Sequence, residues 1–489
     1  MFTFLLKRPR HYASRLRPKG VGEKTLLRTL FLPSVLLTFS LTVIYLFTPT
    51  GKFLDLRAID FLLNTTARDL QTNKTVTIAI DDNSLRQYGQ WPWPRYRIAM
   101  LLDKIQQGGA AITAINILFP EPDQTSPIHW QKALHHDLGY SVDTSAVPKI
   151  LLDHDAYLAN TLTNSSAILG YELLFSPPQT QTHECSPAPA PLKSSATAPA
   201  PLSFYVAQAI LCNNETLNNA GTPSGFFNCT PDKDGILRRL PLLLDFNGKT
   251  YPSFALQTLL KAKDIKDFSI NTGPLGTRYI NPGNIPIDKK GNYLISGQPA
   301  AKEAYISATE LLSDGIDASL LKDKIVFLGI TASGLAQKYR VATNNNISVV
   351  DIHKIAYQSL SSYRHSFRGD FFWVVELLLT YMLTVLLLFT IAKFSTPWVC
   401  TILFAIFSTL GTGSFYLAWG WGFLFSPLFP WSCLLFNFFI LVTLKYKYYQ
   451  QRSAFDAGNT LQLLETSQET LQSILNTIPD IVFRLDSNG

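Results

Sequence analysis

Four long apolar segments, nearly free of charged residues, constrain this chain more than any other feature of its sequence. They cover about 26–47, 371–391, 398–417 and 423–444. A helix rises ~1.5 Å per residue, so a helix of about 20 residues crosses ~30 Å of hydrocarbon. Core helices of soluble proteins seldom run so far without a charged face. We therefore predict a membrane protein with four transmembrane helices at these positions.

Basic residues lie beside the first and the last of these segments and contribute to a net charge of +7. They are Lys7, Arg8, Arg10, Arg15, Arg17, Lys19, Lys24, Arg28, Lys445, Lys447 and Arg452. Because positive residues that flank a span stay in the cytoplasm, we expect both chain ends inside and residues 48–370 outside. Nucleic-acid binding would also explain the basic segment 1–25. Its position against an apolar segment favours an orientation signal instead, with the lipid bilayer and no nucleic acid as partner.

The first apolar segment is predicted to remain as an uncleaved anchor. It is longer than the apolar region of a typical signal peptide, and no small-x-small cleavage pattern follows it at 48–51. Residues 52–70 look like a helix that continues from the membrane.

The exported segment then holds a strand, a helix and a second strand in close succession. Residues 76–80 are apolar and largely β-branched without strict alternation, as in a strand covered on both faces. From Arg95 the apolar residues follow helical spacing up to Ile105, and a Gly-Gly pair supplies the stop. A second buried strand is expected at about 111–119. This spacing predicts a βαβ unit, whose strands are parallel.

Hairpins and a third buried strand complete the exported domain. Asp234-Gly235 and Asn247-Gly248 are dipeptides of tight hairpin turns, and 324–331 is strongly apolar. We therefore predict a mixed α/β domain with a βαβ core and antiparallel hairpins. Residues 176–201 are rich in Pro, Ala, Ser and Thr, and should form an extended, mobile insertion at the surface.

The five cysteines divide between the apolar segments and the exported segment. Cys400 and Cys433 lie in apolar segments and are expected to be inert. Cys185, Cys212 and Cys229 lie where oxidation is possible. Cys212 with Cys229 is the preferred disulfide because it closes a short loop, and free thiols are the alternative. No Cys-x-x-Cys pair exists and the histidines do not converge, so no metal site is predicted.

Several motifs of the exported segment resemble one known family in content and order. They are Ile80-Asp81-Asp82, Trp91-Pro92-Trp93-Pro94-Arg95, Leu118-Phe119-Pro120-Glu121-Pro122-Asp123, Gly225-Phe226, Asp232, Asp234-Gly235, Arg238-Arg239, Pro241, Tyr251-Pro252-Ser253-Phe254, 321–331 and Val350-Asp351-Ile352-His353. The family is the CHASE type 2 domain, an extracytoplasmic sensory domain attached to bacterial histidine kinases, nucleotide cyclases and cyclic-dinucleotide enzymes. The resemblance covers about 50–360, and three spans directly after the domain are the family's usual layout. It implies a bacterial inner-membrane receptor for an unknown extracytoplasmic ligand or protein, with cofactors unknown.

The chain departs from the family pattern at three positions. Asn116 stands where the family usually has an acidic residue, and Gln337 stands where Gly-x-x-Asp-like chemistry is usual. Val349 replaces a customary glycine. If the acidic cluster of the family binds a cation or a polar ligand, this chain has a reduced version of it.

Polar residues follow three predicted strands, at the edge where parallel sheets bind ligands. These candidate ligand-binding residues are Asp81, Asp82, Asn116, Glu121, Thr331 and Ser333. The alternative is structural: Asp81 and Asp82 cap a turn, and Glu121 pairs with Arg95 or Arg97.

The Trp-Pro-Trp-Pro motif is assigned a structural role. Trp91 and Trp93 are expected to be packing anchors rather than surfaces on which a ligand stacks. Pro94 suits the first turn of the following helix, where its missing N–H costs nothing.

Residues 445–478, after the last apolar segment, are predicted to form a signalling helix. Residues spaced 3, 4, 3, 4, 3 form the seam of a short coiled coil: Leu461, Leu464, Gln468, Leu471, Leu475 and Ile478. This favours a homodimer, and an ordinary amphipathic helix is the alternative. Residues 479–489 look like the opening of a PAS domain. Because a strand is unstable without its sheet, we expect a piece of a longer protein.

We therefore expect a transmembrane signal receptor that passes an extracytoplasmic cue to PAS and a missing output domain. A sensor histidine kinase is the favoured output, and a diguanylate cyclase, phosphodiesterase or adenylate cyclase is the alternative. The chain itself shows no catalytic constellation. A membrane-tethered exported hydrolase that uses Asp81, Asp82 and Glu121 is a rival class. A scaffold or transporter component is another, disfavoured because the three closing spans hold no charge except Glu376, expected to be solvated at the outer interface.

Overall fold

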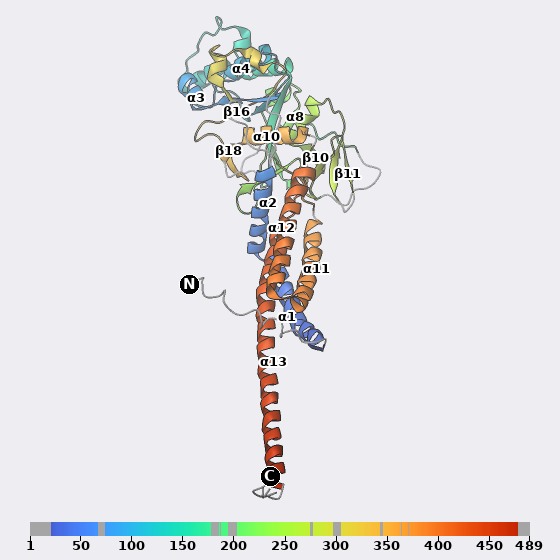
Figure 1. The fold of residues 1–489 in the computed structure, drawn as a ribbon. Helices are drawn as coiled ribbons and strands as arrows, with labels where there is room; N and C mark the ends of the chain where they lie inside the picture. Colours follow the sequence, from blue (N-terminus) through green and yellow to red (C-terminus); the bar gives the residue numbers. More distant parts are fainter. Residues whose placement is uncertain are drawn as a thin grey trace, which may run out of the picture. The chain divides into compact units, whose positions relative to one another are not determined.

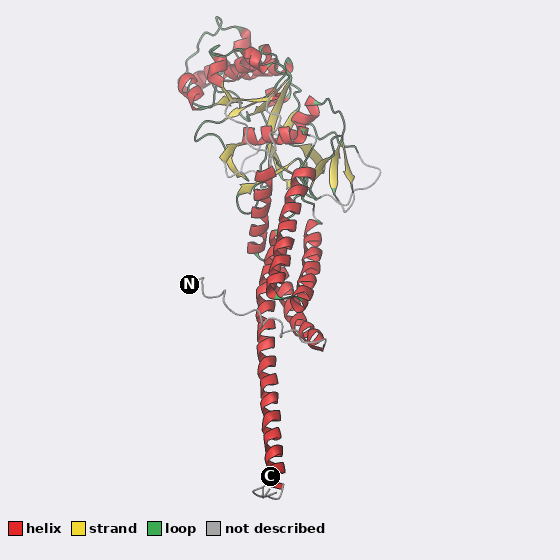
Figure 2. Cartoon of the chain, in the orientation of Figure 1, coloured by secondary structure: helices red, strands yellow, loops and turns green. Residues whose placement is uncertain are grey.

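The computed structural model describes residues 21–66, 74–177, 185, 187–193, 203–273, 277–296, 305–342, 346–362, 364–369 and 371–477. These residues belong to two compact units. The helical unit comprises Met1–Leu54, Val374–Gly411 and Pro427–Gly489, and the α/β unit comprises Asp55–Trp373 and Thr412–Ser426. Every described strand lies in the α/β unit (Figure 2). Residues 1–20 and the predicted start of a PAS domain at 479–489 lie outside the described residues.

Four helices carry the long apolar segments. They are α1 (Val21–Phe47), α11 (Phe372–Lys393), α12 (Thr396–Trp421) and α13 (Leu428–Thr477) (Figure 1). Each is long and apolar enough to cross a membrane. The fourth begins at Leu428 rather than at residue 423, because Gly422 takes a positive φ of 76° and residues 422–427 form a loop. α13 then continues without a break to Thr477.

Polar side chains lie between the helices of the helical unit. Asn437 of α13 accepts a hydrogen bond from Ser34 Oγ of α1 (2.9 Å) and donates one to Thr38 Oγ1 (3.0 Å). Glu376 of α11 is fully buried and accepts a hydrogen bond from the Tyr45 hydroxyl (3.3 Å). The expected solvation of Glu376 is therefore wrong. Such interhelical hydrogen bonds hold membrane helices together where lipid supplies no hydrophobic driving force.

The centre of the α/β unit is a seven-stranded sheet. Its strands, in spatial order, are β15 (Tyr305–Ser307), β1 (Thr75–Ile80), β16 (Ile325–Ile330), β2 (Ile112–Asn116), β3 (Ala167–Leu174) and β5 (Ala209–Leu211), with β6 (Ser224–Phe226) also paired to β3. All pairs are parallel except β3 with β5. β1 and β2 are thus parallel, as the βαβ pattern predicts, but β16 from far along the chain lies between them.

Helices cover both faces of this sheet. α4 (Arg95–Gln107) lies on one face, and α8 (Phe254–Ala262) and α10 (Val349–Ser361) lie on the other (Figure 1). Successive strand residues point to opposite faces: Leu328 of β16 packs in the core with α4, and Phe327 packs with α8 and α10. Burial on both faces explains why the central strands have continuous apolar sequences.

Further helices lie between these elements in the sequence. They are α2 (Pro49–Thr66), α3 (Asp82–Tyr88), α5 (Pro127–Leu138), α6 (His154–Thr163), α7 (Glu215–Asn218) and α9 (Ala308–Leu312), with 3-10 turns at Lys149–Leu151 and Ala318–Leu321. α2 follows α1 almost directly, in agreement with the helix expected after the first span.

Four small sheets complete the α/β unit. They are β10 (Lys249–Pro252)–β9 (Leu243–Phe246)–β4 (Val206–Ala207), β11 (Ser269–Thr272)–β12 (Arg278–Asn281)–β13 (Ile285–Ile287), β14 (Asn292–Leu294)–β8 (Arg239–Pro241) and β18 (Asn346–Ser348)–β17 (Lys338–Val341)–β7 (Ile236–Leu237). Asn247 and Gly248, both with positive φ, join β9 and β10 in the predicted hairpin. Gly235 also has a positive φ, but β6 and β7 on either side pair with β3 and β17 rather than with each other.

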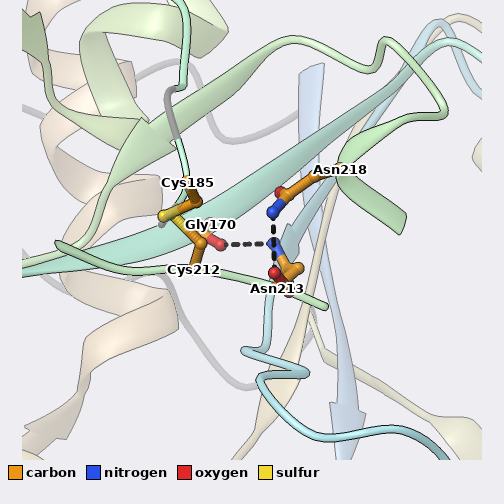
Figure 3. The surroundings of a disulfide bond; sticks show 5 residues. All are labelled: Gly170, Cys185, Cys212, Asn213 and Asn218. Carbon is orange, nitrogen blue, oxygen red and sulfur yellow. Dashed lines mark hydrogen bonds between the residues drawn. A yellow bond between two sulfur atoms is a disulfide. The ribbon is translucent and has the colours of Figure 1, made fainter. Parts of the chain in front are cut away.

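A disulfide joins Cys185 to Cys212, with their Cα atoms 6.3 Å apart (Figure 3). Cys229 is a free thiol, so the predicted pairing of Cys212 with Cys229 is wrong. Short separation along the chain suggested that pairing. Cys212 is instead held beside β3, because the next residue, Asn213, donates a hydrogen bond to the carbonyl of Gly170 (3.0 Å).

Part of the predicted insertion at 176–201 belongs to the described residues. Its backbone pairs with the α/β unit: Ala190 N–H donates to Thr250 O (2.8 Å), and Lys193 N–H donates to Phe268 O (2.8 Å). These bonds and the disulfide hold residues 187–193 in place, so this stretch is extended but anchored. Most of the remaining insertion lies outside the described residues.

Candidate functional site

The polar residues that follow β1 and β16 meet at the carboxyl edge of the main sheet. Asp82, the first residue of α3, accepts hydrogen bonds from Ser333 N–H (2.9 Å) and Ser333 Oγ (3.0 Å). Thr331 N–H donates to Ile80 O (3.0 Å). β1 and β16 are parallel neighbours, so their carboxyl ends coincide. The structure therefore brings Asp82, Thr331 and Ser333 together at the predicted edge.

Asp81 ties three elements together at the same edge. As the N-cap of α3 it accepts from Ser84 N–H (2.8 Å) and Ser84 Oγ (2.7 Å), and also from the Oγ of Ser307, the last residue of β15 (2.9 Å). Burial alone would raise the pKa of Asp81, but these hydrogen bonds outweigh it, and its pKa lies below the ordinary value of 3.8. A carboxylate with three such donors is a turn-forming group.

Asn116 and Glu121 lie apart from these contacts. Asn116 ends β2 opposite Gly329 of β16, and its Nδ2 is buried without a hydrogen-bond partner among the described residues. The Glu121 side chain is exposed. Arg95 reaches only the backbone carbonyl of Glu121, through Nη2 (3.3 Å). For Arg95, the alternative pairing with the Glu121 carboxylate is therefore not formed among the described residues.

A buried ionic network lies where the segment after β2 meets α4 and α6. Arg95, Asp123, His154 and Asp155 are each at most 7% exposed. His154 Nδ1 lies 3.2 Å from Asp123 Oδ2, and Asp155 accepts from Asp123 N–H (2.7 Å). Arg95 Nε lies 3.6 Å from Asp155 Oδ1, and its guanidinium stacks over Phe119 at 4.5 Å. None of the sequence motifs predicted this network.

Asp123 caps α4 from outside the helix. Pro94 precedes Arg95 as N-cap and has no side-chain cap. Asp123 Oδ2 instead accepts the first helical N–H, that of Arg95 (2.7 Å), and Oδ1 accepts from Thr125 N–H (2.9 Å) and Oγ1 (2.7 Å). Burial opposes ionisation, but these donors and the charge of Arg95 lower the pKa of Asp123. A carboxylate also suits the positive end of the helix dipole.

One sequence signal could have found this residue. Asp followed two residues later by Thr favours an Asx turn, in which the acid accepts both Thr donors, and Asp123-Gln124-Thr125 has that form. The sequence instead suggested Glu121 of the same motif, as a candidate ligand-binding residue or as a partner of Arg95 or Arg97. The other partners, His154 and Asp155, come from α6 and carry no such signal.

Trp91 and Trp93 pack next to one another, with ring centroids 6.3 Å apart. Trp93 is 1% exposed and donates from Nε1 to Gly89 O (2.9 Å). The Arg97 guanidinium lies 5.4 Å from the Trp93 ring and 5.3 Å from the Tyr88 ring. In this structure Trp93 anchors the segment between α3 and α4.

A second polar cluster is buried under α10. Lys354, 1% exposed, donates to Thr77 Oγ1 of β1 (2.7 Å) and lies 3.5 Å from Asp351 Oδ1. Its ammonium also lies 4.6 Å from the Tyr305 ring. Burial lowers the pKa of Lys354, against the charge of Asp351. Burial and Asp351 raise the pKa of Tyr305.

The polar groups of these clusters bond chiefly to one another. In the part of the chain that the structure describes, no three His, Cys, Asp or Glu side chains are placed to hold a metal ion. Asp81 and Asp82, which the hydrolase hypothesis needs as catalytic acids, accept hydrogen bonds from serines instead. This arrangement fixes the carboxyl edge and its helices in one geometry.

A family model described as the CHASE2 domain matches residues 36–392, well over half of the chain. The match begins within α1 and ends within α11, and so contains the main sheet and every predicted site residue. No curated protein and no solved structure matches the chain.

Proposed function

Because this chain belongs to the CHASE2 domain family, we propose that it is a transmembrane signal receptor of a bacterial inner membrane. The CHASE2 domain is a sensory domain of cyclase and histidine kinase receptors. The observation that carries the proposal is that one chain combines the CHASE2 domain with four helices long and apolar enough to cross a membrane. A sensory domain in such a chain supports a role in passing a cue across the bilayer.

In the proposed topology residues 48–370 face the outside and both termini lie in the cytoplasm. The basic residues beside the first and the last span support this orientation. An even number of spans places both ends on one side, in keeping with the four apolar helices.

The receptor is proposed to act as a homodimer through the C-terminal part of α13. Apolar residues of the predicted seam stand exposed on this long helix, including Leu461 (62%), Leu464 (59%) and Leu475 (66%). Two copies that paired these seams in parallel would bury them. PAS and an output domain would follow, with a sensor histidine kinase favoured over a diguanylate cyclase, phosphodiesterase or adenylate cyclase.

The cue is proposed to act on the α/β unit, as an extracytoplasmic ligand or protein. Asp81, Asp82, Asn116, Glu121, Thr331 and Ser333 remain the proposed ligand-binding set. The free Nδ2 of Asn116 supports a recognition role for this edge. The hydrogen bonds that already occupy Asp81 and Asp82 favour recognition over hydrolysis.

Cysteine labelling tests the topology. Single cysteines at Lys249 and Glu465, both exposed, would be introduced after Cys229, Cys400 and Cys433 are changed to Ser. A membrane-impermeant maleimide should label the Lys249→Cys variant in intact spheroplasts and the Glu465→Cys variant only after lysis. Labelling with the reverse pattern would overturn the orientation.

Assay of the full-length protein in membranes tests the output. Transfer of the ATP γ-phosphate to the protein itself would support a histidine kinase. Formation of a cyclic mononucleotide or dinucleotide without autophosphorylation would replace that proposal with a cyclase.

A further inference from the structure

Three segments that adjoin the predicted spans in sequence converge within the α/β unit. We call them together the clasp: residues 55–66 of α2, residues 364–369 ahead of α11, and residues 418–426 at the end of α12 and in its loop to α13. The first two flank the exported domain. The third is separated from that domain by α11 and most of α12, yet it belongs to the same compact unit.

Backbone hydrogen bonds join the second and third segments. Phe367 N–H donates to Gly422 O (2.7 Å), and Leu424 N–H donates to Phe367 O (3.0 Å). This pair forms a parallel bridge between Phe367 and Phe423. Arg368 Nη1 also donates to Leu424 O (3.4 Å). The loop thus adds a short strand-like contact to the exported domain.

Apolar side chains join the first and third segments. Ile59, Leu62 and Leu63 of α2 are at most 5% exposed and share one core cluster with Ala418 and Leu424. The same cluster contains a residue from the body of the domain, Leu294. Burial of these apolar side chains stabilises the clasp in addition to the hydrogen bonds between Phe367 and the loop.

Ion pairs fix α2 to the domain. Arg238 is 2% exposed and donates to both carboxylate oxygens of Asp60 (2.5 and 2.8 Å) as well as to Asp232 and Asp234. Arg368 donates from Nη2 to both oxygens of Asp55 (3.0 and 2.9 Å). Arg368 therefore bonds to both α2 and the loop.

The loop leads directly into α13. Ser414 Oγ of α12 donates to Phe425 O and holds the loop against its own helix (2.5 Å). Pro427 follows, and α13 begins at Leu428 and runs for 50 residues. Because a continuous helix is stiff, a shift or rotation imposed at Leu428 reaches its far end. The span order by itself would route the signal through α11 and α12 first.

From these contacts we infer that the sensory domain controls α13 directly, by holding the α12–α13 loop in the clasp. This rests on the proposed receptor function and adds its route of transmission. A cue that favours one arrangement of the domain would move Phe367 and Arg368 and, through them, Gly422 and Leu424. α11 and α12 would then anchor the domain rather than relay the signal. Such control requires the cue to bind the two arrangements with different affinity.

Substitution of Gly422 tests the route. Gly422 has a φ of 76°, and a Cβ there would lie 2.1 Å from the backbone oxygen of His365, so Gly422→Ala must open the clasp. Gly413→Ala, within α12, is the matched control, because a Cβ there meets nothing within 4 Å. The readout is the rate of disulfide cross-linking between two copies that carry Leu464→Cys, in full-chain membranes after Cys229, Cys400 and Cys433 are changed to Ser.

The expected result is a change of about fivefold in that rate for Gly422→Ala, which is the equivalent of about one lost hydrogen bond, and no change for Gly413→Ala. Equal rates in all three proteins would overturn the inference. Retention of the Cys185–Cys212 disulfide and resistance to trypsin would show that the Gly422→Ala domain is folded.

A second variant does not depend on opening the clasp. Phe367→Cys with Phe423→Cys places two thiols at the bridged positions and should form a disulfide readily in membranes. Absence of that disulfide would overturn the inference as well. If Leu464→Cys fails to cross-link even in the parent, the dimeric receptor proposal fails, and the Phe367–Phe423 pair still reports on the clasp.

Discussion

Arg95 and Arg238 are both almost completely buried, at 7% and 2% exposed, but the two guanidinium groups differ in their hydrogen-bond partners and in the direction of their pKa shift. Arg238 donates hydrogen bonds to three carboxylates, and these outweigh burial and raise its pKa. Arg95 makes no hydrogen bond to a carboxylate through its side chain among the described residues, and burial lowers its pKa in spite of Asp155 and Asp123. At Arg238 the carboxylates accept hydrogen bonds from the guanidinium. At Arg95 the nearby carboxylates accept hydrogen bonds chiefly from backbone N–H groups.

The two arginine sites therefore contribute to the fold in different ways. The Arg238 cluster ties α2 to the sensory domain, so its strength lies in side-chain ion pairs between elements. The Arg95 network orders the chain between β2 and α6, so its strength lies in carboxylates that cap and turn the backbone. The two sites should therefore respond differently to removal of the arginine and of an acid.

The largest effect is expected from Arg238→Met. Loss of the guanidinium leaves Asp60, Asp232 and Asp234 close together without a cation, and breaking a buried pair in this way costs about 3–5 kcal/mol. Chemical denaturation of the protein in detergent micelles measures the loss. Arg239→Met is the matched control: its side chain is 36% exposed and lies 3.9 Å from Asp288. Similar losses for both variants would contradict the role given to Arg238.

A smaller effect is expected from Asp123→Asn. The amide keeps one acceptor but loses the other, so either the Arg95 N–H or the Thr125 donors lose a partner, at a cost of about 2 kcal/mol. The same denaturation experiment measures it, and Glu121→Gln, at an exposed side chain of the same motif, should be nearly neutral. A larger loss of stability for Glu121→Gln than for Asp123→Asn would instead favour Glu121, the residue predicted from the sequence, as the important acid of this motif.

Acid should weaken both sites. The pKa of Asp234 is lowered by its hydrogen bond from Arg238, and that of Asp123 is lowered, against burial, by its backbone and Thr125 donors. A carboxyl with a lowered folded-state pKa contributes stability that is present above its ordinary value of 3.8 and is lost as the pH falls through the folded-state value. Asp234→Asn and Asp123→Asn should each flatten the decline in stability below about pH 5. Curves parallel to that of the parent would refute this.

The smallest effect is expected at the carboxyl edge, from Ser333→Ala. Ser333 is exposed, and the substitution removes only the hydroxyl bond to Asp82 and keeps the backbone N–H bond. We expect a loss of about 0.5 kcal/mol, measured as a shift in the denaturation midpoint. A loss above that of Asp123→Asn would make this edge, rather than the Arg95 network, the stronger constraint on the fold.

Local rules of sequence predicted several elements well. The dipeptide Asn247-Gly248 makes a hairpin because both residues accept positive φ, and that preference belongs to the residues themselves. The apolar pattern from Arg95 to Ile105 forms α4, with its apolar side against the sheet. Such features depend on residues that are neighbours in the sequence, so they can be predicted without the structure.

Contacts between segments far apart in the chain could not be predicted from the sequence. The apolar run at 324–331 predicts a strand, but not that this strand lies between β1 and β2. Cys212 lies nearer in sequence to Cys229 than to Cys185, yet the disulfide follows the placement of Cys212 beside β3. The predicted edge came together at Asp82 and Ser333 because parallel strands share a carboxyl end, whereas Glu121 does not bond to either of them among the described residues.

Four apolar helices, a largely parallel α/β core and the family could all be predicted from the chain alone, because segment length, apolar period and motif order are properties of the sequence. Only the folded structure reveals which acids contact which arginine, and that the loop after α12 belongs to the α/β unit. The physical reason is that a hydrogen bond or an ion pair needs atoms within about 3 Å. Asp60 with Arg238, and Phe367 with Gly422, reach that distance only when the whole domain is folded.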